Sequence, residues 1–168
     1  MIRVLLGRVE DTATDGLLRP VRSDFTGISG ASRRVEAAAG DDIRRRLDGM
    51  GDLPVGGAVV TPGGDLEAMF LIHVVLESPE EPVTTMAVQR GLVNGLRRAA
   101  EWEMASLSLP PLGLGAGTME PEESARLMVE VLLDHLRQGE PPAELVIVVE
   151  STYEEDLFRR VLAMAERS

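Results

Sequence analysis

A glycine-rich stretch is the part of this sequence best suited to bind an anion. It runs Leu107-Ser-Leu-Pro-Pro-Leu-Gly-Leu-Gly-Ala-Gly-Thr118 and leads directly into a helix-like segment at 119–128. The pattern predicts a strand, a turn and a helix, and the N–H groups of such a turn can face a phosphate because glycine lets the backbone approach closely. The same pattern also fits a tight connection that binds nothing. The candidate ligand-binding residues of this stretch are Gly113, Leu114, Gly115, Ala116 and Gly117.

Arginines form a second candidate group for anion binding. They are frequent between positions 19 and 46, whereas the acidic residues lie mainly elsewhere in a chain of net charge −11. A locally basic region of this kind suits a small anionic ligand or an acidic partner. It is equally explained as solvated helix faces paired with carboxylates such as Asp24 and Glu36. The negative charge of the whole chain disfavours binding to a nucleic-acid backbone.

The sequence offers no recognisable metal site or catalytic triad. The chain has no cysteine, which removes disulfides, thiol catalysis and cysteine-ligated zinc. No group of His, Asp and Glu has the spacing of metal ligands, and no Ser-His-Asp arrangement is visible. His73 lies in an apolar run and His135 on a helix-like face, so both are expected to be structural. We therefore expect no bound metal and no cofactor.

Strand-like and helix-like segments alternate along most of the 168 residues. Apolar or β-branched runs predict strands, and a period near 3.6 residues predicts helices. The expected strands are 2–6, 16–18, 57–61, 69–76, 106–109 and 145–149. The expected helices are 31–39, 41–50, 85–103, the segment after the glycine-rich stretch, and a last helix that starts at a capping box formed by Thr152 and Glu155. This order predicts one α/β domain over residues 1–168, with a largely parallel or mixed sheet covered on both faces.

The expected topology places two loops together. Ligands of open α/β sheets bind at the carboxyl ends of the strands. The glycine-rich stretch follows one expected strand, and segment 19–30 follows the strand that contains Leu17. We therefore expect two glycine-bearing loops to face each other across a cleft.

Hydropathy argues against a membrane location. No apolar run approaches the roughly 20 residues of a membrane-spanning helix. The apolar start of the chain, residues 1–7, is too short and too soon interrupted for a signal peptide. Together with the missing cysteines, these features predict a cytoplasmic protein.

Taken with other stretches, the two loops resemble the macro domain, an α/β/α module that binds ADP-ribose and in some members hydrolyses ADP-ribosyl esters. Segment 55–62 (Val-Gly-Gly-Ala-Val-Val-Thr-Pro) is similar to the family's Gly-Glu-Ala-Val-x-Thr-x strand. Segment 70–75 (Phe-Leu-Ile-His-Val-Val) resembles its Tyr-Val-Ile-His strand, and segment 108–117 its Phe-Pro-x-Leu-Gly-Thr-Gly-x-Gly loop. Because order and spacing match over nearly the whole chain, the resemblance implies a three-layer α/β/α fold with a mixed central sheet.

The first loop matches the family in its glycine and apolar positions but not in its polar ones. Arg19 and Arg22 stand where the family has two asparagines, and Ser32 stands where active members often carry an aspartate. Arginine has only donors, and serine is a poor base without a histidine beside it. Near the N-terminus, Arg8 replaces an aspartate that usually accepts from the adenine amino group, and Glu10 could take that role only if the backbone shifts. No catalytic residue is assigned for these reasons.

The resemblance implies a site built mostly from backbone N–H groups, which tolerate changes of side chain. Arg19 or Arg22 either adds a charge-assisted contact to a phosphate or fills the cleft. Tyr153 stands where the family often has an aromatic residue near the adenine, or else it packs at the start of the last helix. The candidate binding residues outside the glycine-rich stretch are Val9, Glu10, Arg19, Arg22, Gly27, Ser29, Gly30 and Tyr153.

Three functions fit these observations. The first is a module that binds ADP-ribose or a related phosphate-bearing nucleotide without turnover. The second is a hydrolase that removes ADP-ribose from proteins or small molecules, against which Arg19 and Ser32 argue; Asp24, the one carboxylate of the first loop, is interpreted as a turn cap or an arginine partner. The third is a scaffold whose pocket is closed by arginines, with Arg44–Arg46 and the acidic loop near Glu80 as contact surfaces within a homo-oligomer.

Overall fold

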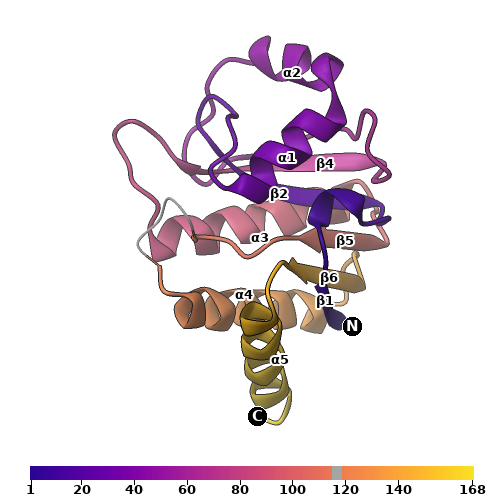
Figure 1. Cartoon of the computed structure of the whole chain (residues 1–168), viewed down its shortest axis with the longest axis vertical. Coiled ribbons are helices and arrows are strands. Elements are labelled where there is room, and N and C mark those ends of the chain that lie inside the picture. Colours follow the sequence, from indigo (N-terminus) through magenta and orange to yellow (C-terminus); the bar gives the residue numbers. More distant parts are fainter. Residues whose placement is uncertain (115–118) are drawn as a thin grey trace.

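A computed structural model of the chain describes residues 1–114 and 119–168 (Figure 1). Within these residues the strands form a six-stranded sheet in the order β1-β6-β5-β2-β4-β3. Neighbouring strands of this described sheet are parallel, except that β3 runs antiparallel to β4. The strands are β1 (Ile2–Leu6), β2 (Gly16–Arg22), β3 (Ala58–Pro62), β4 (Phe70–Glu77), β5 (Ser106–Leu109) and β6 (Glu144–Val149).

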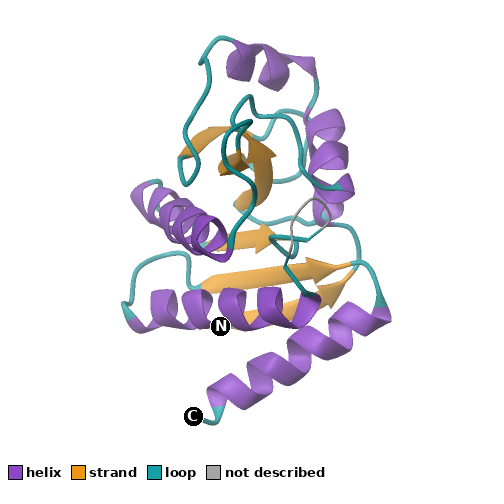
Figure 2. Ribbon diagram, turned by 90° about the vertical axis from the view of Figure 1, so that its left-hand side faces the viewer, coloured by secondary structure: helices purple, strands orange, loops and turns teal. Residues whose placement is uncertain are grey.

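Helices cover both faces of this sheet (Figures 1 and 2). α1 and α2 pack on one face; α3 and α4 pack on the other, and α5 lies against α4 and β1. This arrangement confirms the three-layer α/β/α fold with a mixed sheet. In the described part of the chain, each helix is too short or too polar to cross a membrane. The helices are α1 (Gly30–Ala39), α2 (Asp41–Asp48), α3 (Thr85–Glu101), α4 (Pro121–Arg137) and α5 (Thr152–Glu166), with a 3-10 turn η1 (Val9–Asp11) after β1.

The central strands are apolar on both faces because each face contacts a helical layer. In β2, Leu17 and Val21 belong to the core beneath α1 and α2, whereas Leu18 belongs to the core beneath α3 and α4. In β6 the run 145–149 is buried throughout. The sequence pattern therefore predicts the middle of the sheet well.

Strand β2 extends past the predicted end at Leu18 to Arg22, so Arg19 and Arg22 lie in a strand and not in the following loop. The prediction failed because arginines and a proline are unusual in a central strand. Strand β5 pairs with β2 only at Gly16 and Leu17. Beyond Leu17, the side of β2 that faced β5 faces the loop between β2 and α1 instead. On this side the carbonyl of Pro20 accepts from the N–H of Ile28 at 3.4 Å. Proline is tolerated here because no neighbouring strand needs a backbone N–H from this position.

The start of α5 also differs from the prediction. Ser151, not Thr152, is the N-cap residue, and its Oγ accepts from the N–H of Glu154 at 3.1 Å. Glu154 in turn accepts from the N–H of Glu150 at 3.4 Å. The N-cap therefore lies one residue earlier than the sequence pattern indicated, because Ser and Thr are both good N-caps, and the carboxylate of Glu154 reaches the residue before the cap instead of closing the predicted capping box.

Two glycines let α3 pack closely against the sheet. A β-carbon at Gly91 would lie 2.5 Å from Val74 Cγ1 and 2.8 Å from Leu76 Cδ2, and one at Gly95 would lie 2.6 Å from Leu18 Cδ1. Glycine lowers helix propensity, so these positions are explained by the close approach of helix and sheet.

We expect Gly91→Val to lower the free energy of unfolding by about 1–3 kcal/mol, because the new side chain must displace Val74 and Leu76 in a close-packed core. Urea unfolding followed by circular dichroism measures this change. Val93→Ala is the matched control, since Val93 is on the same helix and 39% exposed. Equal stabilities of the two variants would contradict the proposed packing.

Candidate ligand-binding site

A cavity of about 240 Å³ lies at the carboxyl-terminal rim of the sheet. Its walls come from the first turn of α1, the loop after β5, and the segment that joins β6 to α5. The two loops that the sequence places on one rim do meet here in the described part of the chain. Among the residues that line the cavity are Ser29, Gly30, Arg34, Pro110, Leu114 and Glu150.

The first turn of α1 presents free backbone donors to this cavity. Ser29 is the N-cap, and its Oγ accepts from the N–H of Ser32 at 3.1 Å while its carbonyl accepts from the N–H of Arg33 at 3.0 Å. Among the described residues, none accepts from the N–H groups of Ser29, Gly30 or Ala31. Free N–H groups and the positive end of the helix dipole favour an anion at this position.

Two guanidinium groups flank the same turn. A β-carbon at Gly30 would lie 3.6 Å from Nη1 of Arg34 and 3.9 Å from Nη2 of Arg33. Arg34 Nε donates to Glu10 Oε2 at 2.6 Å, and its Nη2 donates to Glu150. These hydrogen bonds raise the pKa of Arg34, and the bond to Glu10 has the larger effect. The Arg34 side chain therefore links η1 to the segment after β6 at the edge of the cavity.

Glu10 has one carboxylate oxygen without a partner. Its side chain is 9% exposed, and Oε1 is buried with no hydrogen bond to the described residues. Val9, the residue before it, is also buried. An enclosed carboxylate oxygen without a donor is unfavourable, so Oε1 is an unfilled acceptor close to Arg34.

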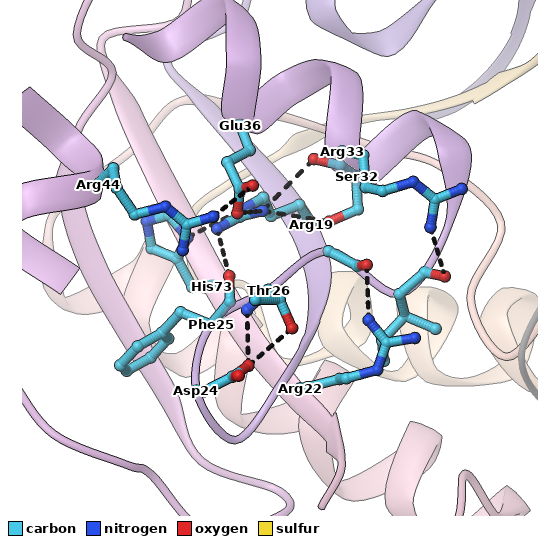
Figure 3. Close-up of polar contacts among 12 residues, drawn as sticks. Arg19, Arg22, Asp24, Phe25, Thr26, Ser32, Arg33, Glu36, Arg44 and His73 are labelled. Atoms are coloured by element: carbon cyan, nitrogen blue, oxygen red, sulfur yellow. Dashed lines mark hydrogen bonds and ion pairs between the residues drawn. The ribbon is translucent and has the colours of Figure 1, made fainter. Parts of the chain in front are cut away.

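Arg19 points into the protein beneath α1 and is 1% exposed (Figure 3). Its Nε donates to Nδ1 of His73 at 2.9 Å, its Nη1 to Glu36 at 3.2 Å, and its Nη2 to the carbonyl of Phe25 at 2.9 Å. Burial lowers the pKa of Arg19 to about 10, although Glu36 acts in the opposite direction. The guanidinium thus stays charged near neutral pH, and its donors are directed at protein groups.

Arg22 lies at the end of β2 and is partly exposed. Its Nε donates to Glu77 Oε1 at 3.0 Å and its Nη1 to the carbonyl of Gly27 at 3.0 Å. Ser32 is fully buried, and its Oγ donates to the carbonyl of Pro20 at 2.7 Å. Neither side chain is placed to act as a general base, which must reach the attacking water.

Asp24 caps the turn that follows β2, as the sequence interpretation expected. It accepts from the N–H of Thr26 at 3.0 Å and from its Oγ1 at 2.7 Å (Figure 3). These two hydrogen bonds lower the pKa of the Asp24 carboxyl group. A carboxylate held in this way is a weaker base than a free one.

The other candidate residues are distributed around the site. Gly27 is buried, and a β-carbon there would lie 2.8 Å from the backbone nitrogen of Arg33, which explains the glycine. Gly113 has φ +84° and packs against Met119. Tyr153 is 63% exposed on the first turn of α5 and does not line the cavity. The remaining predicted residues, Gly115, Ala116 and Gly117, lie outside the described residues.

The sequence interpretation missed Arg34 and Glu150 as residues of this site. The available signals were weak: Arg34 is one of several arginines near the start of an expected helix, and Glu150 simply follows an apolar strand. Their pairing depends on the meeting of segments far apart in the chain, which no local pattern indicates.

Comparison with known proteins identifies the family of this fold. The Macro domain family model matches residues 19–128. An O-acetyl-ADP-ribose deacetylase of Klebsiella pneumoniae is 25% identical, over 95% of this chain and 95% of its own. A variant of the Oceanobacillus iheyensis macrodomain with ADPR superimposes with a TM-score of 0.87 at 18% identity, over 98% of this chain and 93% of its own. The same macrodomain with ADP gives a TM-score of 0.86 at 18% identity, over 98% of this chain and 90% of its own.

Buried His73 predicts how stability depends on pH. Its Nδ1 accepts from Arg19 and its Nε2 lies 2.8 Å from Thr61 Oγ1, so the ring is held neutral. Burial, and then the charge of Arg19, lower the pKa of His73 well below 6.5. Below about pH 6.5 the unfolded chain gains a proton that the folded chain does not, so the free energy of unfolding should fall by up to about 1.4 kcal/mol per pH unit.

Urea unfolding of the wild type and of His73→Gln between about pH 7.5 and pH 5 tests this expectation. Glutamine cannot take up the proton but keeps a donor and an acceptor. The variant should be less stable at neutral pH and should lose less stability on acidification. If the free energy of unfolding fell equally with pH in both proteins, the protonation of His73 would not differ between the folded and unfolded chains.

Proposed function

This chain belongs to the macro domain family, and on that premise we propose that it binds ADP-ribose or a related phosphate-bearing nucleotide without turning it over. The observation that carries the proposal is the first turn of α1, whose N–H groups at 29–31 open onto a cavity at the rim of the sheet. Solved macrodomains with ADPR and with ADP support it, since they share the fold of this chain. We propose a cytoplasmic setting, which a chain without cysteine permits.

The phosphates are proposed to bind at the first turn of α1. Backbone N–H groups recognise a phosphate whatever side chains surround them, so this part of the site tolerates the loss of the family's usual residues. Arg34, whose guanidinium group lies beside Gly30 and lines the cavity, adds positive charge beside the same N–H groups. A diphosphate is the anion that best fits both the donors and the charge.

The nucleobase is proposed to bind beside Glu10. An exocyclic amino group offers the donor that Glu10 Oε1 lacks. Glu10 would then take the role of the family's aspartate, whose position is occupied by Arg8 in this chain. The carboxylate is already oriented by its bond to Arg34. Glu10 therefore takes the adenine contact in this proposal, and its partner Arg34 lines the cavity together with Pro110 and Leu114.

Hydrolysis is the second candidate function, because a relative bears the name O-acetyl-ADP-ribose deacetylase. The geometry at the corresponding positions argues against it. Arg22 has only donors, and the hydroxyl of Ser32 is buried and bonded to Pro20. A general base would have to come from another residue, and Asp24 is engaged in its turn.

Calorimetric titration with ADP-ribose is expected to give a dissociation constant in the micromolar range. Gly30→Glu should weaken binding by about tenfold or more, since it places a negative charge beside the phosphates. It should not lower the melting temperature, because a carboxylate at a helix N-terminus is favourable. Gly30→Gln is the matched neutral control and should bind more tightly than Gly30→Glu.

Equal affinities of these two variants would place the anion elsewhere. Absence of heat from the wild type, even with millimolar ADP-ribose, would overturn the proposal in favour of a scaffold with a closed pocket.

Incubation with O-acetyl-ADP-ribose is expected to leave the ester intact, because the described residues offer no placed base at the first loop. Chromatography of the nucleotides over time measures acetate loss as a change of retention. Deacetylation by the wild type that disappears in Asp24→Asn would contradict this expectation and would assign the chain to the hydrolases.

A further inference from the structure

Three arginines each hold one carbonyl group of the loop between β2 and α1 (Figure 3). Arg19 Nη2 donates to the carbonyl of Phe25 at 2.9 Å, and Arg22 Nη1 donates to that of Gly27 at 3.0 Å. Arg33 Nη1 donates to the carbonyl of Ile28 at 3.3 Å. The three guanidinium groups therefore approach this loop from β2 on one side and from α1 on the other.

Two of these arginines are also held by β4, and one of them by α1 as well. Arg19 is held by His73 of β4 and by Glu36 of α1, and Arg22 is held by Glu77 at the end of β4. A guanidinium that bridges two partners in one plane has little freedom to turn toward a third. The loop carbonyls are thus attached to rigid elements of the fold.

The loop needs such support. Phe25 has φ +70°, a left-handed conformation that is unfavourable for a residue with a large side chain, and it is 2% exposed. Its own N–H donates to the carbonyl of Arg22 at 2.7 Å, and the N–H of Arg22 donates to the carbonyl of Thr26 at 2.8 Å. At 28 and 29 the chain has isoleucine and serine, which restrict the backbone more than glycine does.

Holding the carbonyl groups sets the direction of the N–H groups that follow. In a trans peptide the C=O of one residue and the N–H of the next point in opposite directions. When Arg33 holds the carbonyl of Ile28, the N–H of Ser29 must point the other way. Ser29 is the first of the three residues at the start of α1 whose N–H groups meet no acceptor within residues 1–114 and 119–168.

We infer that Arg19, Arg22 and Arg33 are positioning residues, which hold the loop carbonyls so that the N–H groups at 29–31 meet an anionic ligand. They act through the backbone and not by contact with the ligand. The inference rests on the proposed function only for the identity of that ligand, because the hold on the loop exists in the free protein.

The variant Arg22→Lys distinguishes a positioning role of Arg22 from a direct electrostatic contact between Arg22 and the ligand. Lysine keeps the positive charge but cannot bridge Glu77 and the carbonyl of Gly27 in one planar fork. Arg22→Met removes both charge and donors. Positioning predicts that both variants bind ADP-ribose about tenfold more weakly than the wild type, whereas a contact by charge predicts that lysine retains most of the affinity. Arg126→Lys, an exposed arginine on α4, is the control and should bind as the wild type does.

Hydrogen exchange of the free protein provides a readout that needs no ligand. The N–H groups of Arg22 and Phe25 should exchange at least about tenfold faster in Arg22→Lys and Arg22→Met, while those of β6 should keep their rates. Arg33→Lys should act in the same direction. These variants replace partly exposed or exposed side chains, so they avoid the unfolding risk of changing the buried Arg19.

Wild-type affinity in Arg22→Lys together with weak binding in Arg22→Met would overturn the inference, and so would unchanged exchange in the loop. A wild type that binds no ADP-ribose would defeat the proposed function instead, and the exchange rates would still decide whether the arginines hold the loop.

Discussion

The ion pair between buried Arg19 and partly buried Glu36 is the constraint on which the site depends. A guanidinium that is removed from water is tolerated only when its charge and its donors are satisfied. Glu36 supplies the charge and is itself shared with Arg44 at 2.6 Å, so β2, α1 and α2 are linked through one carboxylate. Truncating Glu36 would leave two guanidinium groups facing each other, one of them inside the protein. The start of α1 is therefore positioned by a charge network, in addition to its apolar contacts with Leu17 and Val21 beneath it.

The fold could be predicted from the sequence because its signals are local. The apolar run 145–149 and the periodic segment that became α4 each identify an element without reference to the rest of the chain. The end of β2 could not be predicted in this way, since a strand with Arg19 and Pro20 is allowed only where β5 stops pairing with it. That condition is a property of the assembled sheet.

The candidate site was predictable in its backbone but not in its side chains. The glycines and Ser29 pointed to the rim because strand-loop-helix patterns determine where N–H groups are exposed. The directions of Arg19 and Arg22 depend on partners in β4, and the bridge from Glu10 through Arg34 to Glu150 joins three distant segments. Local sequence patterns cannot predict contacts between residues so far apart in the chain. Main-chain donors depend on the fold more than on the side chains around them, so their place is easier to predict than that of the side chains.

The pairing of β1 with β6 has a consequence for how the protein forms. These strands are the first and last of the described sheet along the chain, yet they lie side by side, with Ile2 opposite Leu145 and Leu6 opposite Val149. During synthesis β1 cannot pair until β6 has been made, so β1 stays unpaired for most of translation. The cavity, whose walls come from both α1 and the segment after β6, is among the last features to be completed in the nascent protein.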